Sequence, residues 1–361
     1  MQTISCFRAT VAGCFFTIQH VRIMLQTRFL LLPLLLFVAC QQGADHPTVR
    51  AAAQVGAQPT NEKWLETREI VYQSDDGGAN WQDISAGLPP ELLVMRILPG
   101  KDGEIFLGAQ NGVFRYNPPP SVETWSNEFP MYDQVVGVFS GPSGMYVSWV
   151  ENGFFKNMPG KTAWMPMGSP AEKQYVWSAV ETPAGAVVVC NESGIYKTAD
   201  GGKTWKPVFQ EVAPSNLYIE NGILFGVCFG GILRSTDDGE TWAWILQDKG
   251  SYKSLHLLDG RLTALIRKAD ACTLTFPGDP NAKPNWPDLS AGLSAGLSGI
   301  KHINELQQAG NTLFCSHSGG ISRSDNRGKT WRLILPAPDE NTVLRLAVSK
   351  GKIFVVKATG C

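Results

Sequence analysis

The residues of this chain that could take part in chemistry lie in polar segments between short apolar runs. Two carboxylates on either side of a glycosidic bond, roughly 5 to 9.5 Å apart, can hydrolyse that bond. Glu151 could supply one of them, with Glu192 or Asp133 as the second. Trp149 precedes Glu151 by two positions, and an aromatic ring beside a carboxylate also suits the binding of a polar ligand. The same segments are therefore compatible with hydrolysis and with recognition.

Nine residues of these segments are our ligand-binding candidates: Trp149, Glu151, Asn152, Asn191, Glu192, Arg267, His317, Tyr132 and Asp133. Their mixture of aromatic, amide and charged groups suits a glycan or a peptide. Solvated loops are normally polar as well, and for any single candidate this is the simpler explanation. The neighbouring segments also contain Gln110, Asn111, Phe229 and Arg96.

A repeated motif indicates which elements position these segments. Four stretches superpose without gaps: SDDGGANW, TADGGKTW, STDDGETW and SDNRGKTW. The repeated positions are Ser74, Asp76, Gly78 and Trp81; Thr198, Asp200, Gly202 and Trp205; Ser235, Asp237, Gly239 and Trp242; and Ser324, Asn326, Gly328 and Trp331. Short hydroxyl and carboxyl side chains bond nearby backbone amides and close a turn. Because Asn326 carries no charge, we expect a structural role for these turns, and neither catalysis nor metal binding.

The motif resembles the Asp box, or BNR repeat, of sialidases, sortilin-type receptors, xyloglucanases and the photosystem II assembly-factor propellers. That resemblance implies a β-propeller. Seven tryptophans fall at the same phase of the repeat: Trp81, Trp125, Trp164, Trp205, Trp242, Trp286 and Trp331. Their spacing of about 40 residues is typical of a propeller blade.

The expected fold is therefore all-β, a seven-bladed propeller with four strands in each blade. The segment before Trp81 provides only the outer part of a blade, whereas the C-terminus ends after two strand-like runs near 343–348 and 352–357. We expect residues 341–361 to pair with residues 66–87, so that the N- and C-terminal strands close the ring and remove its open edges.

The resemblance to these families does not imply that this chain has their enzymatic activity. Sialidases gather three arginines on the substrate carboxylate, beside a Tyr–Glu nucleophile pair and an acid, and their first arginine lies in a short motif that this chain lacks. Arg96 and Arg345 are present, but a converging triad is not expected. We also expect a single ring, without the second propeller that xyloglucanases use to form their cleft. In size, blade number and membrane tether the chain is most similar to the photosystem II assembly-factor propellers, which bind a polypeptide and are not enzymes.

Composition and charge limit the classes of partner and ligand that we expect. The 361 residues include 31 basic and 32 acidic side chains, so nothing in the net charge of -1 indicates nucleic-acid binding. No CxxC, HExxH or EF-hand spacing occurs, and we expect no cofactor and no metal site. Cys190, Cys228 and Cys315 are expected to be buried thiols, although an exported protein could form a Cys190–Cys228 bridge.

The N-terminus carries an export signal. From Met24, a basic start and an apolar run lead to Phe37-Val38-Ala39-Cys40, which resembles a bacterial lipobox. We predict a signal peptide over residues 1–39, with Met24 a candidate for the true start. Cys40 would be lipidated, residues 40–61 would form a flexible tether, and residues 62–361 the propeller.

The sequence thus favours a monomeric, lipid-anchored module of the bacterial envelope, periplasmic or on the cell surface. In this interpretation it is noncatalytic and binds a protein segment or a glycan on the face opposite the Asp boxes. The alternative is a glycoside hydrolase, sialidase-like or another exo-glycosidase, acting on extracellular glycans. A purely structural ring is the third possibility.

Overall fold

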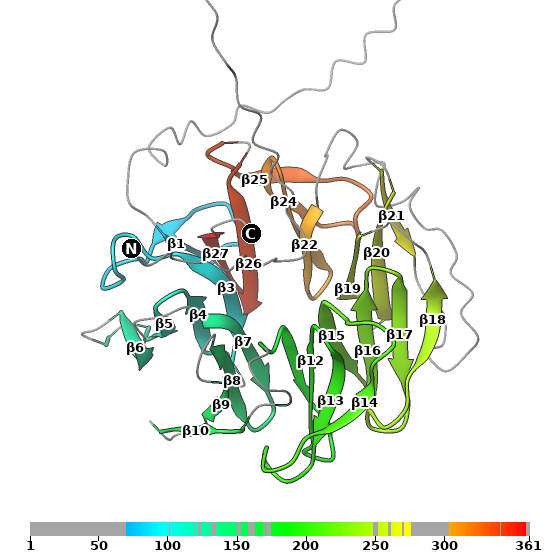
Figure 1. Ribbon diagram of the computed structural model, residues 1–361. Coiled ribbons are helices and arrows are strands. Elements are labelled where there is room, and N and C mark those ends of the chain that lie inside the picture. Colours follow the sequence, from blue (N-terminus) through cyan, green and yellow to red (C-terminus); the bar gives the residue numbers. More distant parts are fainter. Residues whose placement is uncertain are drawn as a thin grey trace, which may run out of the picture. The chain divides into compact units, whose positions relative to one another are not determined.

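The computed structural model describes residues 70–358 except 101, 119, 122–123, 131–134, 150–152, 158–162, 169, 171–174, 248–251, 259–260, 269–270, 276–302 and 340. In this part of the chain every regular element is a β-strand (Figure 1). The all-β class predicted from the sequence is confirmed. No helix among these residues is long and apolar enough to cross a membrane.

Most strands form four-stranded antiparallel groups that follow the order of the chain. The first two groups are β3 (Val94–Pro99), β4 (Ile105–Ala109), β5 (Gly112–Tyr116) and β6 (Trp125–Pro130), and β7 (Val135–Gly141), β8 (Gly144–Trp149), β9 (Gly153–Asn157) and β10 (Trp164–Pro166). The next two are β11 (Ser178–Glu181), β12 (Val187–Asn191), β13 (Gly194–Thr198) and β14 (Lys206–Phe209), and β15 (Asn216–Glu220), β16 (Ile223–Cys228), β17 (Gly231–Ser235) and β18 (Ala243–Gln247).

Two further groups follow in chain order. They are β19 (Tyr252–Leu258), β20 (Arg261–Lys268) and β21 (Ala271–Thr275), and β22 (Ile303–Ala309), β23 (Thr312–His317), β24 (Gly320–Ser324) and β25 (Arg332–Pro336). The predicted anchor Trp286 lies outside the described residues.

The last group joins strands from the two ends of the described chain. It contains β26 (Val343–Ser349), β27 (Lys352–Ala358), β1 (Val71–Ser74) and β2 (Gln82–Asp83). β1 pairs antiparallel with β27, with Val71 opposite Val356 and Ser74 opposite Ile353. A single parallel residue pair, Ala358 with Val94, connects this group to β3.

Successive groups touch mainly through their first strands, which are β3, β7, β11, β15, β19, β22 and β26 (Figure 1). β3 contacts β7, β7 contacts β11, and β11 contacts β15. β19 contacts β16 of the preceding group and β22 of the following one, β22 contacts β26, and β26 contacts β3.

Burial changes across each group. The second strands β4 and β12 are buried at every residue, which explains their continuous apolar sequences such as Val187-Val188-Val189-Cys190. A strand with sheets packed against both of its faces favours such a run over an alternating one. The fourth strands, such as β14 and β25, are largely exposed. The core therefore lies between the inner strands of neighbouring groups.

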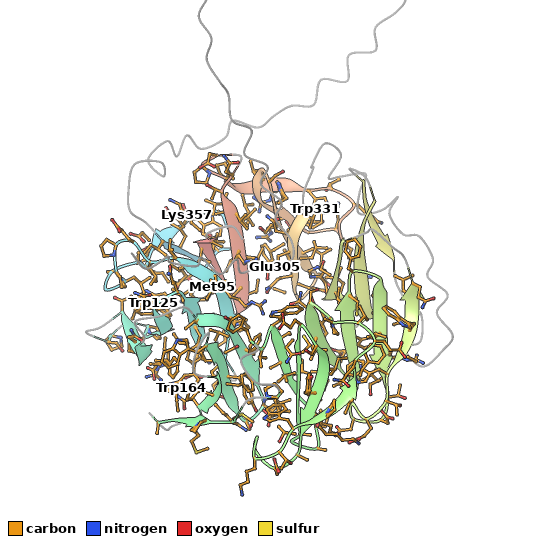
Figure 2. The ribbon with its side chains drawn as sticks, in the orientation of Figure 1. Met95, Trp125, Trp164, Glu305, Trp331 and Lys357 are labelled. Atoms are coloured by element: carbon orange, nitrogen blue, oxygen red, sulfur yellow. The ribbon has the colours of Figure 1, made fainter. Side chains whose placement is uncertain are left out.

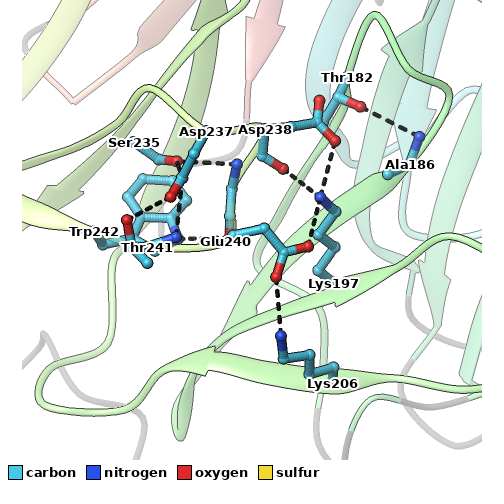
Figure 3. A network of polar contacts seen from close by, with 11 residues as sticks. Thr182, Ala186, Lys197, Lys206, Ser235, Asp237, Asp238, Glu240, Thr241 and Trp242 are labelled. Atoms are coloured by element: carbon cyan, nitrogen blue, oxygen red, sulfur yellow. Dashed lines mark hydrogen bonds and ion pairs between the residues drawn. The ribbon is translucent and has the colours of Figure 1, made fainter.

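The Asp boxes connect third and fourth strands. In the box after β17, Ser235 Oγ donates to Asp237 Oδ1 at 2.8 Å, and the backbone N–H groups of Gly239 and Thr241 donate to Ser235 Oγ and Asp237 Oδ1 (Figure 3). Burial raises the pKa of Asp237, but donors from Thr241 and Ser235 outweigh it and bring the pKa to about 2. Asn326 makes the same backbone bond, from Thr330 N at 2.9 Å, without a charge.

The tryptophans at the phase of the repeat, inside and outside the four boxes, connect neighbouring groups. Four indole N–H groups donate to backbone carbonyls in or just after the last strand of the neighbouring group: Trp81 to Ile334 at 3.2 Å, Trp125 to Ile84 at 2.6 Å, Trp164 to Glu128 at 2.8 Å and Trp205 to Met167 at 2.8 Å. Trp242 and Trp331 donate instead to the glycine carbonyls of their own boxes. Trp125, Trp164 and Trp331 are labelled in Figure 2.

A polar network adds a second link between two groups. Lys197 of β13 is buried, and its Nζ donates to Asp238 O at 2.7 Å and pairs with Glu240 Oε1 at 3.0 Å (Figure 3). Lys206 of β14 pairs with the other carboxylate oxygen of Glu240 at 2.9 Å. These contacts hold the box that follows β17 against the preceding group.

Candidate functional site

The candidate face is the edge of the groups opposite the Asp boxes. It consists of the turns between second and third strands and the connections that lead into the first strands. Backbone hydrogen bonds fix it: Gln110 N donates to Leu93 O at 3.0 Å within one group, and Val135 N of the next group donates to Gln110 O at 3.2 Å. The face is therefore built on fixed backbone.

Polar atoms without partners gather at this face. Among the described residues, five buried side-chain atoms have no hydrogen-bond partner: Asn111 Oδ1, Trp149 Nε1, Asn191 Nδ2, Arg345 Nε and Gln73 Oε1. The first three lie at the second turn of three successive groups, whereas Gln73 is next to a box. An unpaired buried polar group costs about 1–3 kcal/mol, and each one calls for an explanation, such as a bound ligand or water.

Two of these atoms belong to predicted candidates on neighbouring groups. The Trp149 ring packs nearly perpendicular to Phe129, with centroids 6.5 Å apart, and lies 6.3 Å from the Phe155 ring. Asn191 is fully buried, and its Oδ1 accepts the backbone N–H of Ser193 at 2.9 Å. Packing and turn bonding thus hold both side chains in place while one donor on each remains unused.

The other candidates differ in what the structure describes of them. Glu192 is exposed in the turn after β12. His317 is buried, and its ring nitrogens contact Ser322 Oγ at 2.8 Å and Gly319 N at 3.0 Å, within its own hairpin. Burial also lowers the pKa of His317. Arg267 is described only as a backbone position of β20, and Tyr132, Asp133, Glu151 and Asn152 lie outside the described residues.

Exposed apolar side chains lie at the same face. Phe229, between β16 and β17, is 74% exposed, Leu93 before β3 is 44% exposed, and Tyr175 before β11 is 40% exposed. The other large apolar side chains that are exposed in the described chain, Met165 and Leu333, are in the fourth strands β10 and β25. Apolar groups gathered on one face of a protein are typical of an interaction surface.

Charged side chains form a level just inside the candidate face. Arg96, Glu305 and Arg345 are each the third residue of a first strand, in β3, β22 and β26. Burial raises the pKa of Glu305, while the Leu346 N–H and the charges of Arg345 and Arg96 lower it. Glu305 Oε2 accepts Leu346 N at 3.0 Å, and Figure 2 shows Glu305 between β22 and β26.

This charged level was missed in the sequence analysis, which named Arg96 and Arg345 only singly and did not consider Glu305. In β3 and β22 a bulge directly precedes the charged residue, between Val94 and Arg96 and between Ile303 and Glu305. A bulge re-aims the side chains that follow it. The alternation of inward and outward side chains along a regular strand therefore does not predict that Arg96, Glu305 and Arg345 lie at the same level.

Other reactive side chains have structural partners. Glu181 is buried and accepts hydrogen bonds from Ser143 N and Tyr146 OH, both at 3.0 Å, across two groups. Cys190, Cys228 and Cys315 are buried and not disulfide-bonded. Within the described part of the chain, no group of three or more His, Cys, Asp or Glu side chains is arranged to hold a metal ion.

No protein-family model matches the chain, and no curated protein matches it. Solved structures do resemble it. YCF48 from Cyanidioschyzon merolae is 15% identical over 74% of this chain and 96% of its own length, with a TM-score of 0.54. A structure of YCF48 bound to a D1 peptide is similar at 16% identity, covering 74% of this chain and 93% of that one, with a TM-score of 0.51.

Two larger proteins share the fold. The GH74 enzyme of Niastella koreensis is 12% identical over 75% of this chain, with a TM-score of 0.53, and the match covers 44% of the enzyme. The extracellular domain of the putative one-component system BT4673 from B. thetaiotaomicron is 10% identical over 76% of this chain, with a TM-score of 0.52. The match covers 41% of that domain. At these identities the likeness establishes a β-propeller fold and no activity.

Proposed function

We propose that this chain is a noncatalytic recognition module that binds an extended polypeptide segment across the candidate face. The observation that carries the proposal is the coincidence, at one face, of three unpaired polar atoms and three exposed apolar side chains. An extended segment presents backbone donors and acceptors in alternation. It can therefore supply a donor to Asn111 Oδ1 and acceptors to the N–H groups of Trp149 and Asn191.

Apolar side chains of such a segment would cover Phe229, Tyr175 and Leu93. Aromatic side chains exposed at a protein surface are frequent anchors of protein–protein contacts. A leucine is a poor platform for a sugar ring, which favours a polypeptide over a glycan. The peptide complex of YCF48, a chain of the same fold, supports this choice by analogy.

The architecture we propose is a seven-bladed ring closed by the N- and C-terminal strands. The pairing of β1 with β27 supports it, as do the contacts between successive groups that lead from β3 to β26 and from β26 back to β3. Trp286 would anchor the blade that begins with β19. Closure would leave no sheet edge open to pairing with other chains.

The location we propose is the outer surface of a bacterial membrane. The lipobox-like sequence ending at Cys40 supports lipid anchoring after removal of residues 1–39, with residues 40–61 as a tether to the propeller. The likeness to the extracellular domain of BT4673 agrees with export. The recognition face would thereby act close to a membrane surface.

A binding selection tests the proposal. The full-length protein, solubilised in detergent, is presented to a random peptide display library, a glycan array and a panel of chromogenic glycosides. We expect enrichment of peptides and no glycoside turnover. Glycan binding without peptide enrichment would contradict the proposal. Turnover that is abolished by Glu151→Gln would make the chain a glycoside hydrolase and would also refute it.

A further inference from the structure

We propose that the candidate face is turned toward the membrane that holds the lipid anchor, and that its ligand is a polypeptide segment adjoining the membrane-spanning part of another protein. The polypeptide ligand and the lipid anchor rest on the function and the location proposed above. The orientation itself rests on the place where the chain enters the propeller.

The chain enters the described structure at the candidate face. β27 is the second strand of its group and runs from the edge of the Asp boxes to the candidate face. β1 pairs antiparallel with it, with Val71 opposite Val356 (Figure 1). At its other end β1 stops at Ser74, the first residue of an Asp box. The start of β1 therefore lies at the candidate face, and the chain that precedes it leaves the propeller from this face.

The entry point is fixed to the fold. The backbone N–H groups of Ile70 and Val71 both donate to Ser85 Oγ, at 2.8 and 2.9 Å. Lys357 N donates to Ile70 O at 3.3 Å, and Ile84 N donates to Val71 O at 3.0 Å. Ile70 and Val71 are also buried. A pull from the N-terminal side therefore acts on fixed backbone and turns the propeller as a whole.

The entry point lies beside the exposed apolar surface of the same face. β27 ends at Ala358, which pairs with Val94 of β3, and the preceding residue Leu93 is 44% exposed. Phe229, which is 74% exposed, belongs to the same face. The anchored end of the chain and the side chains that we expect to bind the ligand are thus on one side of the propeller.

The length of the chain before the propeller limits the distance of this face from the membrane. About 30 residues separate Cys40 from Ile70. A flexible chain of this length has a root-mean-square end-to-end distance of about 30 Å and reaches about 100 Å when fully extended. The Asp boxes are farther from the entry point by the length of a strand, about 20 Å for the seven residues of β27. The candidate face is therefore the nearer of the two faces on average.

A polypeptide held at the same membrane gains from this arrangement. Two groups attached to one surface meet at a raised effective concentration, which a peptide free in solution lacks. The lipid itself is a poorer occupant, because acyl chains covering Phe229 would offer no acceptor to Trp149 Nε1 and Asn191 Nδ2, which are buried without partners. The backbone carbonyls of an extended segment would supply these acceptors.

Energy transfer to the membrane tests the orientation without any peptide. The full-length lipidated protein is reconstituted in phosphatidylcholine vesicles that contain an acceptor-labelled phosphatidylethanolamine. A fluorescent amino acid replaces either Phe229 or Leu333, which follows an Asp box at the start of β25. We expect more transfer from position 229 than from position 333. Inserting roughly 60 Gly/Ser residues after Gln58 should lower both signals and the difference between them. Equal transfer in the original protein, more transfer from position 333, or a Cys40 without lipid would overturn the proposal.

The same peptide shown at two heights tests the partner. A peptide from the selection described above is joined to a membrane-spanning polyleucine helix, either directly or through roughly 100 Gly/Ser residues. The unanchored control is the full-length Cys40→Ala protein with an ordinary export signal in place of residues 1–39. We expect the anchored protein to bind the membrane-adjacent peptide at least tenfold more tightly than the control does, with less gain through the long spacer. Both proteins should bind the free peptide equally. Equal affinities for the membrane-adjacent peptide would overturn the partner.

The outcomes separate this proposal from the proposed function. Equal transfer from the two positions, with binding of the free peptide intact, would overturn the orientation and leave polypeptide recognition standing. More transfer from position 229, together with a failure to enrich any peptide, would contradict the polypeptide ligand. Binding of peptide-free vesicles by the unanchored protein that is lost in Phe229→Ala would make the lipid surface the occupant and refute the partner.

Discussion

Replacement of Trp125 by phenylalanine tests how the groups of strands are held together. The Trp125 side chain is 2% exposed, and its Nε1 donates to Ile84 O at 2.6 Å, across the boundary between two groups. Its ring centroid is 5.3 Å from that of Tyr116. The substitution leaves the buried carbonyl unpaired, which costs about 1–3 kcal/mol, and the lost ring contacts add about 1–2 kcal/mol. We expect the free energy of unfolding to fall by about 2–5 kcal/mol.

Trp331→Phe is the matched control for this change. Trp331 is less buried, and its Nε1 donates to Gly328 O at 3.0 Å within its own box, so no contact between groups is lost. We expect a loss of about 1 kcal/mol from the single hydrogen bond. Guanidinium denaturation followed by circular dichroism measures both values. Equal losses in the two variants, or a smaller loss for Trp125→Phe, would refute the fastening role of the indole N–H.

Three further outcomes follow from local geometry. Gly202 has a φ of +85°, and a Cβ at this position would lie 2.2 Å from Met167 O. Gly201 has a φ of +74°, but a Cβ there would meet open space. Gly202→Ala should therefore lower thermal stability far more than Gly201→Ala, which should cost about 1–2 kcal/mol. Hydrogen bonds from the backbone and side chain of Asn80 and from Ser74 lower the pKa of Asp76 to about 2, so its stabilising effect is present above the unfolded pKa near 3.8 and is lost as the pH falls toward 2. Asp76→Asn should therefore make the urea unfolding free energy less dependent on pH between 4 and 2, and an unchanged slope would contradict this. Burial raises the pKa of the Cys190 thiol, so iodoacetamide at pH 8 should modify it only after unfolding, and rapid labelling of the native protein would show that the thiol is accessible.

Local features of the fold were predictable from the sequence. The box turns depend on side chains that bond backbone atoms within about four residues, as Ser235 and Asp237 do, so the motif alone specifies them. The amide oxygen of Asn326 accepts the same backbone hydrogen bond as the box carboxylates, so this contact does not need a charge; that the boxes have a purely structural role stays a prediction.

The candidate site was less accessible to prediction. Trp149 and Asn191 could be named because they end second strands at a predicted face, but their unused donors depend on packing against residues distant in sequence. His317 fitted the same pattern, yet its own hairpin supplies bonds to both ring nitrogens. Glu305 was missed because a bulge shifts its strand, and its relation to Arg345 arises only where β22 meets β26.

The central claim is recognition of a polypeptide by the candidate face, and the affinity of a selected peptide for two single variants tests it most directly. Phe229→Ala removes the most exposed apolar side chain of that face, and Leu333→Ala removes an exposed apolar side chain of the fourth strand β25. We predict that Phe229→Ala weakens peptide binding roughly tenfold, the cost of losing an aromatic anchor, while Leu333→Ala leaves it unchanged. Equal affinities in both variants and the wild type would place the binding surface elsewhere and contradict the account.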